Sequence, residues 1–322
     1  MGFAKSTEVY SRTLKIIEEN ELKNGSSGSR LISGNSALHL ETEKLIAKFH
    51  KSESALLYNS GYDANLGLLS CVPQFGDVIL YDELSHASIR DGIRLSKARA
   101  YKFNHNSITD LAEKLSKQTN TVYVVVESVY SMGGDSPNLL EIVKLCKQHN
   151  AFLIIDEAHA VGVIGKKGKG LVNKLELEND VFARINTYGK AMGGHGAAIL
   201  GSKHLIEYLI NFSRSFIYTT ALSPHSVATI KASYKELKNS SELKKLQEVI
   251  SNFNTLKEKN NLTKFFIESK SAIHSLVIGD IEKTKRLVEK LAKKNIAVKA
   301  ILSPTVAKGK EQIRFCLHSY NT

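Results

Sequence analysis

Short apolar runs alternate with helical stretches between about residues 53 and 201 of this 322-residue chain. A helix that faces a core repeats its apolar residues every third and fourth position, whereas a fully buried strand is a short continuous apolar run. Seven runs predict strands over 55–59, 78–81, 100–103, 122–127, 152–156, 182–187 and 197–200. The spacing between them predicts helices over 66–70, 88–97, 108–117 and 139–148. This repetition predicts an α/β fold with a mostly parallel sheet and helices on both faces.

The pattern after residue 201 predicts helices followed by a small α+β unit. The predicted elements are a helical stretch over 203–259, a strand over 272–279, a helix over 282–293 and strands over 296–302 and 313–319. Pro224 interrupts the helical stretch, and the polar turn "KNSSEL" predicts a domain boundary near Ser240. We therefore expect three parts, which are an N-terminal arm (1–36), a large domain (37–240) and a small C-terminal domain (241–322).

The composition is ordinary for a soluble globular protein, with 42% hydrophobic and 24% charged residues. No window holds eighteen uncharged apolar residues, and the start of the chain lacks the apolar core of a signal peptide. Cys71, Cys146 and Cys316 are odd in number, far apart and form no CxxC pair. This pattern argues against a disulfide framework and against a zinc site, and a reducing cytoplasm fits it best.

The formal net charge of +12 allows two interpretations. Many lysines lie in helical stretches such as "EKTKRLVEKLAKKN" (282–295), where a solvated surface accounts for them. A basic surface also attracts anionic partners, such as nucleic acid, a nucleotide-bearing substrate or an acidic carrier protein. The chain has no run of arginines interleaved with aromatic residues and no nucleic-acid-binding signature, so we expect no nucleic-acid partner.

The stretch "IIDEAHAVG" (154–162) contains Asp-Glu-Ala-His, which is also the sequence of a helicase box. A helicase needs a phosphate loop as well, GxxxxGK followed by Ser or Thr. None of the Gly-Lys pairs has a glycine at that spacing or a Ser or Thr after the lysine. A different chemistry must therefore explain Asp156 and His159.

Lys190 lies 34 residues beyond Asp156, in the small-residue stretch "NTYGKAMGGHGAAILGS" (186–202). Small neighbours let a bulky group approach the backbone closely. Taken alone, Lys190 is either a solvated residue of a glycine-rich loop or a lysine that forms a Schiff base. A Schiff base with pyridoxal 5′-phosphate needs a carboxylate at the pyridine nitrogen, support for the ring face and a phosphate pocket.

The ends of the predicted strands supply residues of each of these types. Asp156 ends an apolar strand, and the other candidates follow strand ends or helix starts. Each of them alone is equally well explained as a cap, turn or surface residue. Together they point to one edge of the sheet, where open α/β sheets bind their ligands. The candidates are Gly61, Tyr62, His86, Ser131, Asp156, His159, Thr187 and Lys190.

Five motifs in order along the chain resemble those of the α-oxoamine synthases, which are pyridoxal-phosphate enzymes of fold type I. These motifs are "HASIRDG", "ESVYSMGGD", "DEAHAVGVIG", "TYGKAMGGHGAA" and "IYTTALSPH". "GSSGSRLISGN" (25–35), "NSGYDAN" and "RFCLHSYNT" are similar to the branch of the family that makes 8-amino-7-oxononanoate for biotin. The resemblance covers nearly the whole chain and implies a fold type I transferase with a small C-terminal α+β domain.

The resemblance implies a role for each residue that matches a family motif. Lys190 matches the lysine that binds the cofactor as a Schiff base, and Asp156 matches the partner of the pyridine nitrogen. His159 matches the donor to the phenolic oxygen. His86 matches the imidazole that stacks on the ring and reaches the substrate. Further cofactor contacts are implied for Gly61, Tyr62, Ser131 and Thr187.

The resemblance also implies substrates and a partner. Thr219 and Thr220 match residues that contact the phosphate of the neighbouring subunit's cofactor, which implies a homodimer with shared active sites. Arg314 matches the arginine that binds the carboxylate of the amino acid, for which a planar guanidinium is suited. The implied reaction is the decarboxylative condensation of L-alanine with a pimeloyl thioester, carried by coenzyme A or by an acyl carrier protein.

Several alternatives remain open from the sequence. Glycine C-acetyltransferase, 5-aminolevulinate synthase and serine palmitoyltransferase share much of the same constellation. An aminotransferase and an inactive cofactor-binding subunit are further alternatives. Family members usually begin with several dozen further residues, including an Asn-Asp-Tyr-Leu-Gly stretch, and continue into a last helix, so we expect the N-terminal arm and the C-terminal domain to be truncated.

Overall fold

The computed structural model describes residues 2–321, which form two compact units. The larger unit comprises Gly2–Ser128 and Pro137–Ser240, and the smaller comprises Val129–Ser136 and residues 241–321. None of the helices within residues 2–321 is both long and apolar enough to cross a membrane.

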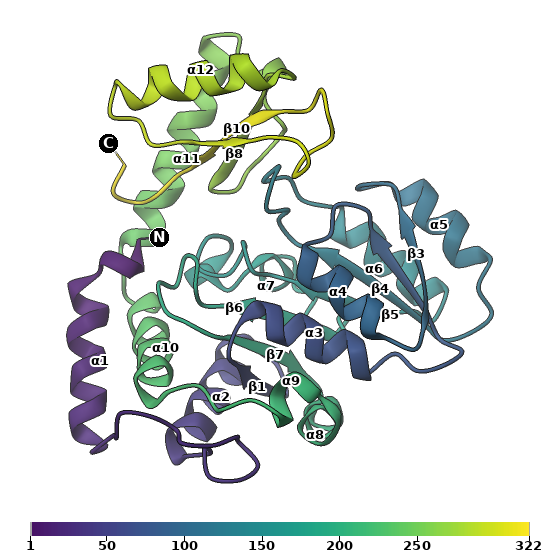
Figure 1. The fold of residues 1–322 in the computed structure, drawn as a ribbon, viewed down its shortest axis with the longest axis vertical. Helices are drawn as coiled ribbons and strands as arrows, with labels where there is room; N and C mark the ends of the chain where they lie inside the picture. The colour runs from purple at the N-terminus through teal and green to yellow at the C-terminus, as the bar shows by residue number, and fades with distance from the viewer. Residues whose placement is uncertain (1, 322) are drawn as a thin grey trace. The chain divides into compact units, whose positions relative to one another are not determined.

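A seven-stranded sheet forms the centre of the larger unit, in the order β1-β7-β6-β5-β4-β2-β3 (Figure 1). Its strands are β1 (Ser54–Tyr58), β2 (Val78–Asp82), β3 (Arg99–Phe103), β4 (Val122–Glu127), β5 (Phe152–Asp156), β6 (Ala183–Thr187) and β7 (Ala197–Gly201). The neighbours from β3 to β6 pair in parallel, whereas β7 is antiparallel to both β6 and β1. The predicted mostly parallel sheet is confirmed, and every predicted strand of this unit lies within one residue of the observed bounds.

Apolar residues cover both faces of this sheet because successive side chains of a strand point to opposite faces. In β4, Val124 and Val126 belong to one buried cluster, whereas Tyr123 and Val125 belong to the other. Helices α5 (Ile108–Ser116), α6 (Leu139–Gln148) and α7 (Leu171–Lys174) contribute to the first cluster, and α3 (Gly61–Cys71), α4 (Ala87–Leu95), α8 (Lys203–Phe212) and α9 (Arg214–Ile217) to the second. Helices on both faces, as predicted, are therefore confirmed.

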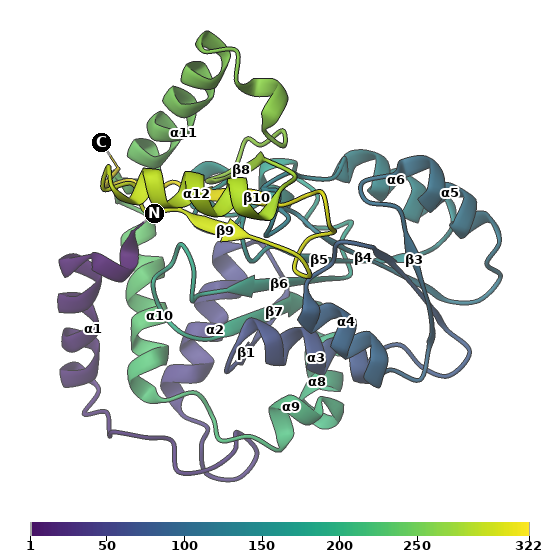
Figure 2. The ribbon, with the colours of Figure 1, turned by 45° about the horizontal axis from the view of Figure 1, so that its top comes forward.

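Three further helices pack together at one side of the larger unit. They are α1 (Thr7–Glu19), α2 (Ala37–Phe49) and α10 (Pro224–Leu237). In both ribbon views α1 lies beside α10 (Figures 1 and 2), and Arg12 donates to Glu236 at 3.3 Å. Neither α1 nor α2 was predicted from the sequence. The buried positions Val9 and Ile16 of α1 are two turns apart, which places both against α10.

The smaller unit contains an antiparallel sheet in the order β8-β10-β9 and two long helices. Its elements are β8 (Ile273–Val277), β9 (Lys299–Ile301), β10 (Gln312–Cys316), α11 (Glu242–Lys259) and α12 (Ile281–Ala292). The predicted strand over 296–302 shortens to three residues because only these pair with β10. The segment 129–136 joins this unit, since the hydroxyls of Ser269 and Ser271 each donate to the Gly134 carbonyl at 2.9 Å.

Candidate active site

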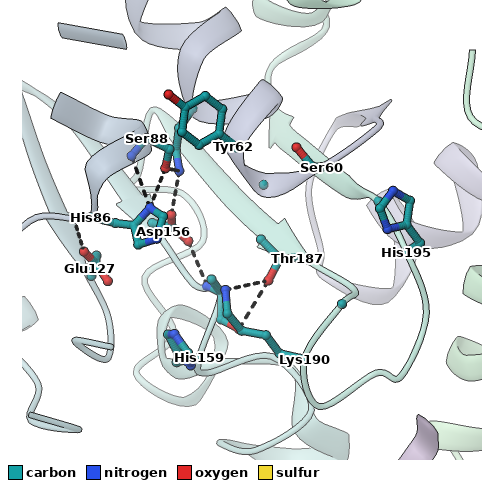
Figure 3. Close-up of a pocket in the computed structure, with 15 residues that line it drawn as sticks. Ser60, Tyr62, His86, Ser88, Glu127, Asp156, His159, Thr187, Lys190 and His195 are labelled. Atoms are coloured by element: carbon teal, nitrogen blue, oxygen red, sulfur yellow. Dashed lines mark hydrogen bonds between the residues drawn. The ribbon is translucent and has the colours of Figure 1, made fainter. Parts of the chain in front are cut away.

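A cavity of about 250 Å³ lies in the larger unit at the carboxyl ends of the central strands (Figure 3). Glu127, Asp156 and Thr187 are the last residues of β4, β5 and β6, and all three line it. The sequence predicted that candidate residues would gather at this edge, where open parallel sheets bind ligands. The complete lining is Ser60, Gly61, Tyr62, Asn65, His86, Ser88, Glu127, Asp156, Ala158, His159, Thr187, Gly189, Lys190, His195 and Gly196.

Asp156 is a buried carboxylate with both oxygens bonded. Its Oδ1 accepts the backbone N–H of Ala158 at 2.8 Å, and its Oδ2 accepts the side-chain amide of Asn65 at 2.8 Å. The side chain is 5% exposed. Two N–H donors stabilise a negative charge that would otherwise be costly to bury.

Glu127 ends the neighbouring strand, in register with Asp156. Its Oε1 accepts the backbone N–H of His86 at 2.6 Å. Burial, and then the charge of Asp156, raises the pKa of Glu127 well above its ordinary value of 4.5. Two carboxylates thus meet at one edge of the cavity, but only one of them was singled out from the sequence.

The first turn of α3 forms another wall of the cavity. Ser60 caps this helix by accepting the N–H of Asp63 at 3.1 Å, and Gly61 and Tyr62 follow it. A Cβ at Gly61 would lie 2.4 Å from Cγ2 of Thr187, so only glycine fits without a shift. The free N–H groups of a helix start favour an anion.

Lys190 reaches the cavity from the loop between β6 and β7. Its Nζ lies 3.5 Å from Oγ1 of Thr187, and the residue is otherwise exposed (Figure 3). The loop closes on itself through bonds from the Tyr188 N–H to the Gly196 carbonyl and from the Gly194 N–H to the Tyr188 carbonyl. A loop held by its own backbone hydrogen bonds therefore carries Lys190 into the cavity.

His86 and His159 line the same cavity, as predicted. His86 is the N-cap of α4, where its Nδ1 accepts the backbone N–H of Ser88 at 3.2 Å. Partial burial lowers the pKa of His86 below 6.5, while Asp156 opposes and Lys190 adds to this shift.

Four predicted residues do not belong to this set. Ser131 and Arg314 are part of the smaller unit, where Nε of Arg314 donates to the Ser131 carbonyl at 2.7 Å. Thr219 and Thr220 follow α9 in the larger unit, and the side-chain amide of Asn59 donates to Oγ1 of Thr219 and to the Thr220 carbonyl. Their implied roles stay predictions.

Sequence reasoning missed Asn65, Ser88, Glu127 and His195. Glu127 could have been found by the rule that singled out Asp156, because both residues end apolar strands. Asn65 could have been suspected because it shares a helix face with the apolar Leu68 and Leu69, three and four positions on. Ser88 and His195 carry no comparable signal.

The family model for aminotransferase class I and II matches residues 6–322. The chain belongs to this family. Among curated relatives, 8-amino-7-oxononanoate synthase of Emericella nidulans is 41% identical over 317 aligned positions, covering 92% of this chain and 77% of that protein. The 8-amino-7-oxononanoate synthase 2 of Bacillus subtilis is 40% identical, covering 92% and 76%.

Solved structures are similar over the whole chain. The 8-amino-7-oxononanoate synthase from Francisella tularensis has a TM-score of 0.83 at 30% identity, covering 100% of this chain and 90% of that one. Serine palmitoyltransferase from S. paucimobilis with a bound PLP–myriocin aldimine has a TM-score of 0.91 at 29% identity, covering 100% and 81%. The expected fold type I architecture is therefore confirmed.

Proposed function

We propose that this chain is a pyridoxal-phosphate-dependent acyltransferase that condenses L-alanine with a pimeloyl thioester. The products are 8-amino-7-oxononanoate, carbon dioxide and the free thiol. The main support is that Lys190, Asp156 and the start of α3 line one cavity. The chain is also about 40% identical to proteins named 8-amino-7-oxononanoate synthase.

The donors and acceptors that line the cavity suit pyridoxal phosphate. Asp156, already bonded by two N–H donors, would partner the protonated pyridine nitrogen. The start of α3 offers backbone N–H groups to the phosphate, and Gly61 leaves a cradle that a Cβ would fill. Lys190 would hold the aldehyde, and His159 would donate to the phenolic oxygen. His86 would support the ring face.

The remaining cofactor contacts would come from three places. Tyr62 and Thr187 would contribute from the cavity itself, and Ser131 would contribute from the smaller unit. Thr219 and Thr220 would reach the cofactor of the partner, so that the enzyme would be a homodimer with shared sites. A cytoplasmic location, expected from the cysteine pattern, is part of the same proposal.

The chain's own residues would carry the substrate and the proton. Arg314 would bind the carboxylate of alanine through its planar guanidinium. Lys190, released from the aldehyde when the amino group of alanine takes its place, would then accept the Cα proton of alanine with its free amine. His86 would hold a substrate oxygen. When bound, pyridoxal phosphate supplies an electron sink for the negative charge left at Cα. The carbon nucleophile would attack the thioester carbonyl, the thiol would leave, and loss of carbon dioxide would follow.

The experiment is an assay of thiol release from pimeloyl-CoA with L-alanine by the purified chain. We expect turnover for the native chain, and loss of both turnover and the visible absorbance of bound cofactor in Lys190→Ala. Lys244→Ala is a matched control because Lys244 is exposed on α11 of the smaller unit. Full activity of Lys190→Ala would contradict the proposal.

A panel of substrates separates the remaining alternatives. Alanine, glycine and serine are each paired with pimeloyl, acetyl and palmitoyl thioesters. Faster turnover with serine and the palmitoyl thioester would favour the palmitoyltransferase reaction, to whose structures this fold is also similar. Turnover that needs a 2-oxo acid and releases no thiol would indicate an aminotransferase.

A further inference from the structure

We propose that Asn65 and Ser88 are positioning residues that hold His86 as the neutral imidazole with its proton on Nε2, and that Asp156 anchors this arrangement. The proposal deepens the function proposed above, because it assigns residues that determine the state of the imidazole in that site. It rests on one continuous chain of hydrogen bonds in the larger unit, drawn as dashed lines in Figure 3.

The direction of each bond in this chain is determined by its first member. The side-chain nitrogen of Asn65 lies 2.8 Å from Oδ2 of Asp156 and 3.0 Å from Oγ of Ser88. An amide nitrogen has two hydrogens and accepts none, so it donates to both oxygens. The flipped amide would set its oxygen against the carboxylate, which is repulsive. Asn65 is 2% exposed, so water does not replace these partners.

Ser88 transmits this direction to His86. Its Oγ already accepts from Asn65, and its own hydrogen is then available for Nδ1 of His86 at 2.8 Å. The backbone N–H of Ser88 points to the same Nδ1 at 3.2 Å, and a backbone N–H can only donate. Nδ1 is thus an acceptor for two donors and carries no proton, which leaves the proton of the neutral ring on Nε2.

The charges around the ring agree with a neutral imidazole. Partial burial lowers the pKa of His86, and the cations Lys190 and Arg90 act in the same direction. Asp156 and Asp91 oppose it. Glu127 adds little negative charge while its raised pKa keeps it protonated.

The functional consequence is a single N–H donor beside the catalytic lysine. A neutral His86 adds no second positive charge next to Lys190. A protonated His86 would repel the Lys190 ammonium group and lower the proton affinity of the Lys190 amine. The same asparagine bonds the carboxylate proposed for the ring nitrogen, so that His86 and Asp156 share one support.

The test measures the state of His86 directly by NMR of the chain labelled with ¹⁵N-histidine, as purified. His86→Gln identifies the signal by its loss. We expect the native signal to report an unprotonated Nδ1, a protonated Nε2 and a pKa below 6.5. In Asn65→Ala and in Ser88→Ala the pKa of His86 should rise by about half a unit or more. Ser88→Ala removes the hydroxyl donor to Nδ1, and Asn65→Ala removes the bond that directs the Ser88 hydroxyl toward Nδ1.

Three comparisons distinguish positioning from general damage to the fold. Ser85→Ala is the matched control, since Ser85 is equally buried, adjacent to His86, and its hydroxyl has no partner among the described residues. It should leave the pKa of His86 unchanged, and Ser88→Thr should restore the native value. The double variant of Asn65 and Ser88 should shift the pKa no further than the larger single shift.

An unchanged pKa and tautomer of His86 in both single variants would overturn the proposal, as would a native signal with the proton on Nδ1. If Asn65→Ala does not fold, Ser88→Ala against Ser88→Thr decides. The readout needs no turnover, so a chain that lacks acyl transfer but shows these shifts would contradict the proposed function and leave this inference standing.

Discussion

The ends of β4 and β5 place two carboxylates side by side, yet the two are in different environments. Glu127 and Asp156 are partners in the parallel register, and both are almost fully buried. Asp156 has an N–H donor on each oxygen, whereas Glu127 accepts one N–H, that of His86, from residues 2–321. The pKa of Glu127 is raised by burial and by the charge of its neighbour.

The difference shows that the end of a strand determines where a carboxylate lies but does not determine whether it is ionised. Hydrogen-bond donors to the ionised form decide which of two adjacent acids keeps the negative charge. One donor comes from the turn after β5 and the other from Asn65 of α3, so the charge of Asp156 depends on a helix distant in the sequence. Of the two acids, Asp156 is therefore the one suited to partner a cationic ring nitrogen.

The largest expected effect separates the two acids by activity. Asp156→Ala should lower kcat for thiol release by about 10²–10³-fold or more, because a preorganised charge in the site is lost. Glu127→Gln, which keeps an oxygen for the His86 N–H, should lower kcat by less than about tenfold. The measurement is steady-state kinetics of both variants with their unfolding midpoints. If both variants lost kcat equally, Asp156 and Glu127 would not differ in their importance for activity, which would contradict this prediction.

A smaller effect appears in the free energy of unfolding. The folded pKa of Glu127 lies above its unfolded value of 4.5, so the folded state binds more protons and loses stability as pH rises from 4.5 through the raised folded pKa. Glu127→Gln mimics the protonated acid and should remove this loss, making the variant more stable than the native chain at alkaline pH by on the order of 2 kcal/mol. Denaturant titrations at pH 5 and pH 9 measure it.

At pH 5 the native chain and Glu127→Gln should differ little, which is the internal control. A native chain whose stability rises between pH 5 and pH 9 by more than that of Glu127→Gln would reverse the sign and contradict the raised pKa.

The sequence predicted the central strands β4 and β5 well because each is a run of mostly apolar, buried residues. The edge strand β3 is largely exposed and was found from its place in the alternation of strands and helices. The same rule located Asp156, since its side chain must lie where β5 leaves the core. It could not separate Asp156 from Glu127, because the distinguishing donor, Asn65, comes from another element. The helix α1 was missed although its buried Val9, Thr13 and Ile16 recur at helical spacing, so periodicity could have found it. The attachment of 129–136 to the smaller unit depends on bonds to residues far away in the chain, which periodicity does not reveal.

The smallest expected effect on activity concerns Glu157, the residue after Asp156 in the same motif. Its Oε1 accepts the N–H groups of Leu171 and Val172, and burial raises its pKa to about 7. Because Glu157 holds the start of α7 and does not line the cavity, Glu157→Gln should keep kcat within about twofold and change the free energy of unfolding by about 1 kcal/mol at most. Glu157→Ala leaves both N–H groups without an acceptor and should cost about 2–3 kcal/mol. If Glu157→Gln lost as much kcat as Asp156→Ala, both acids of the motif would be needed for activity. Lining the cavity would then not explain which acid takes part in the reaction.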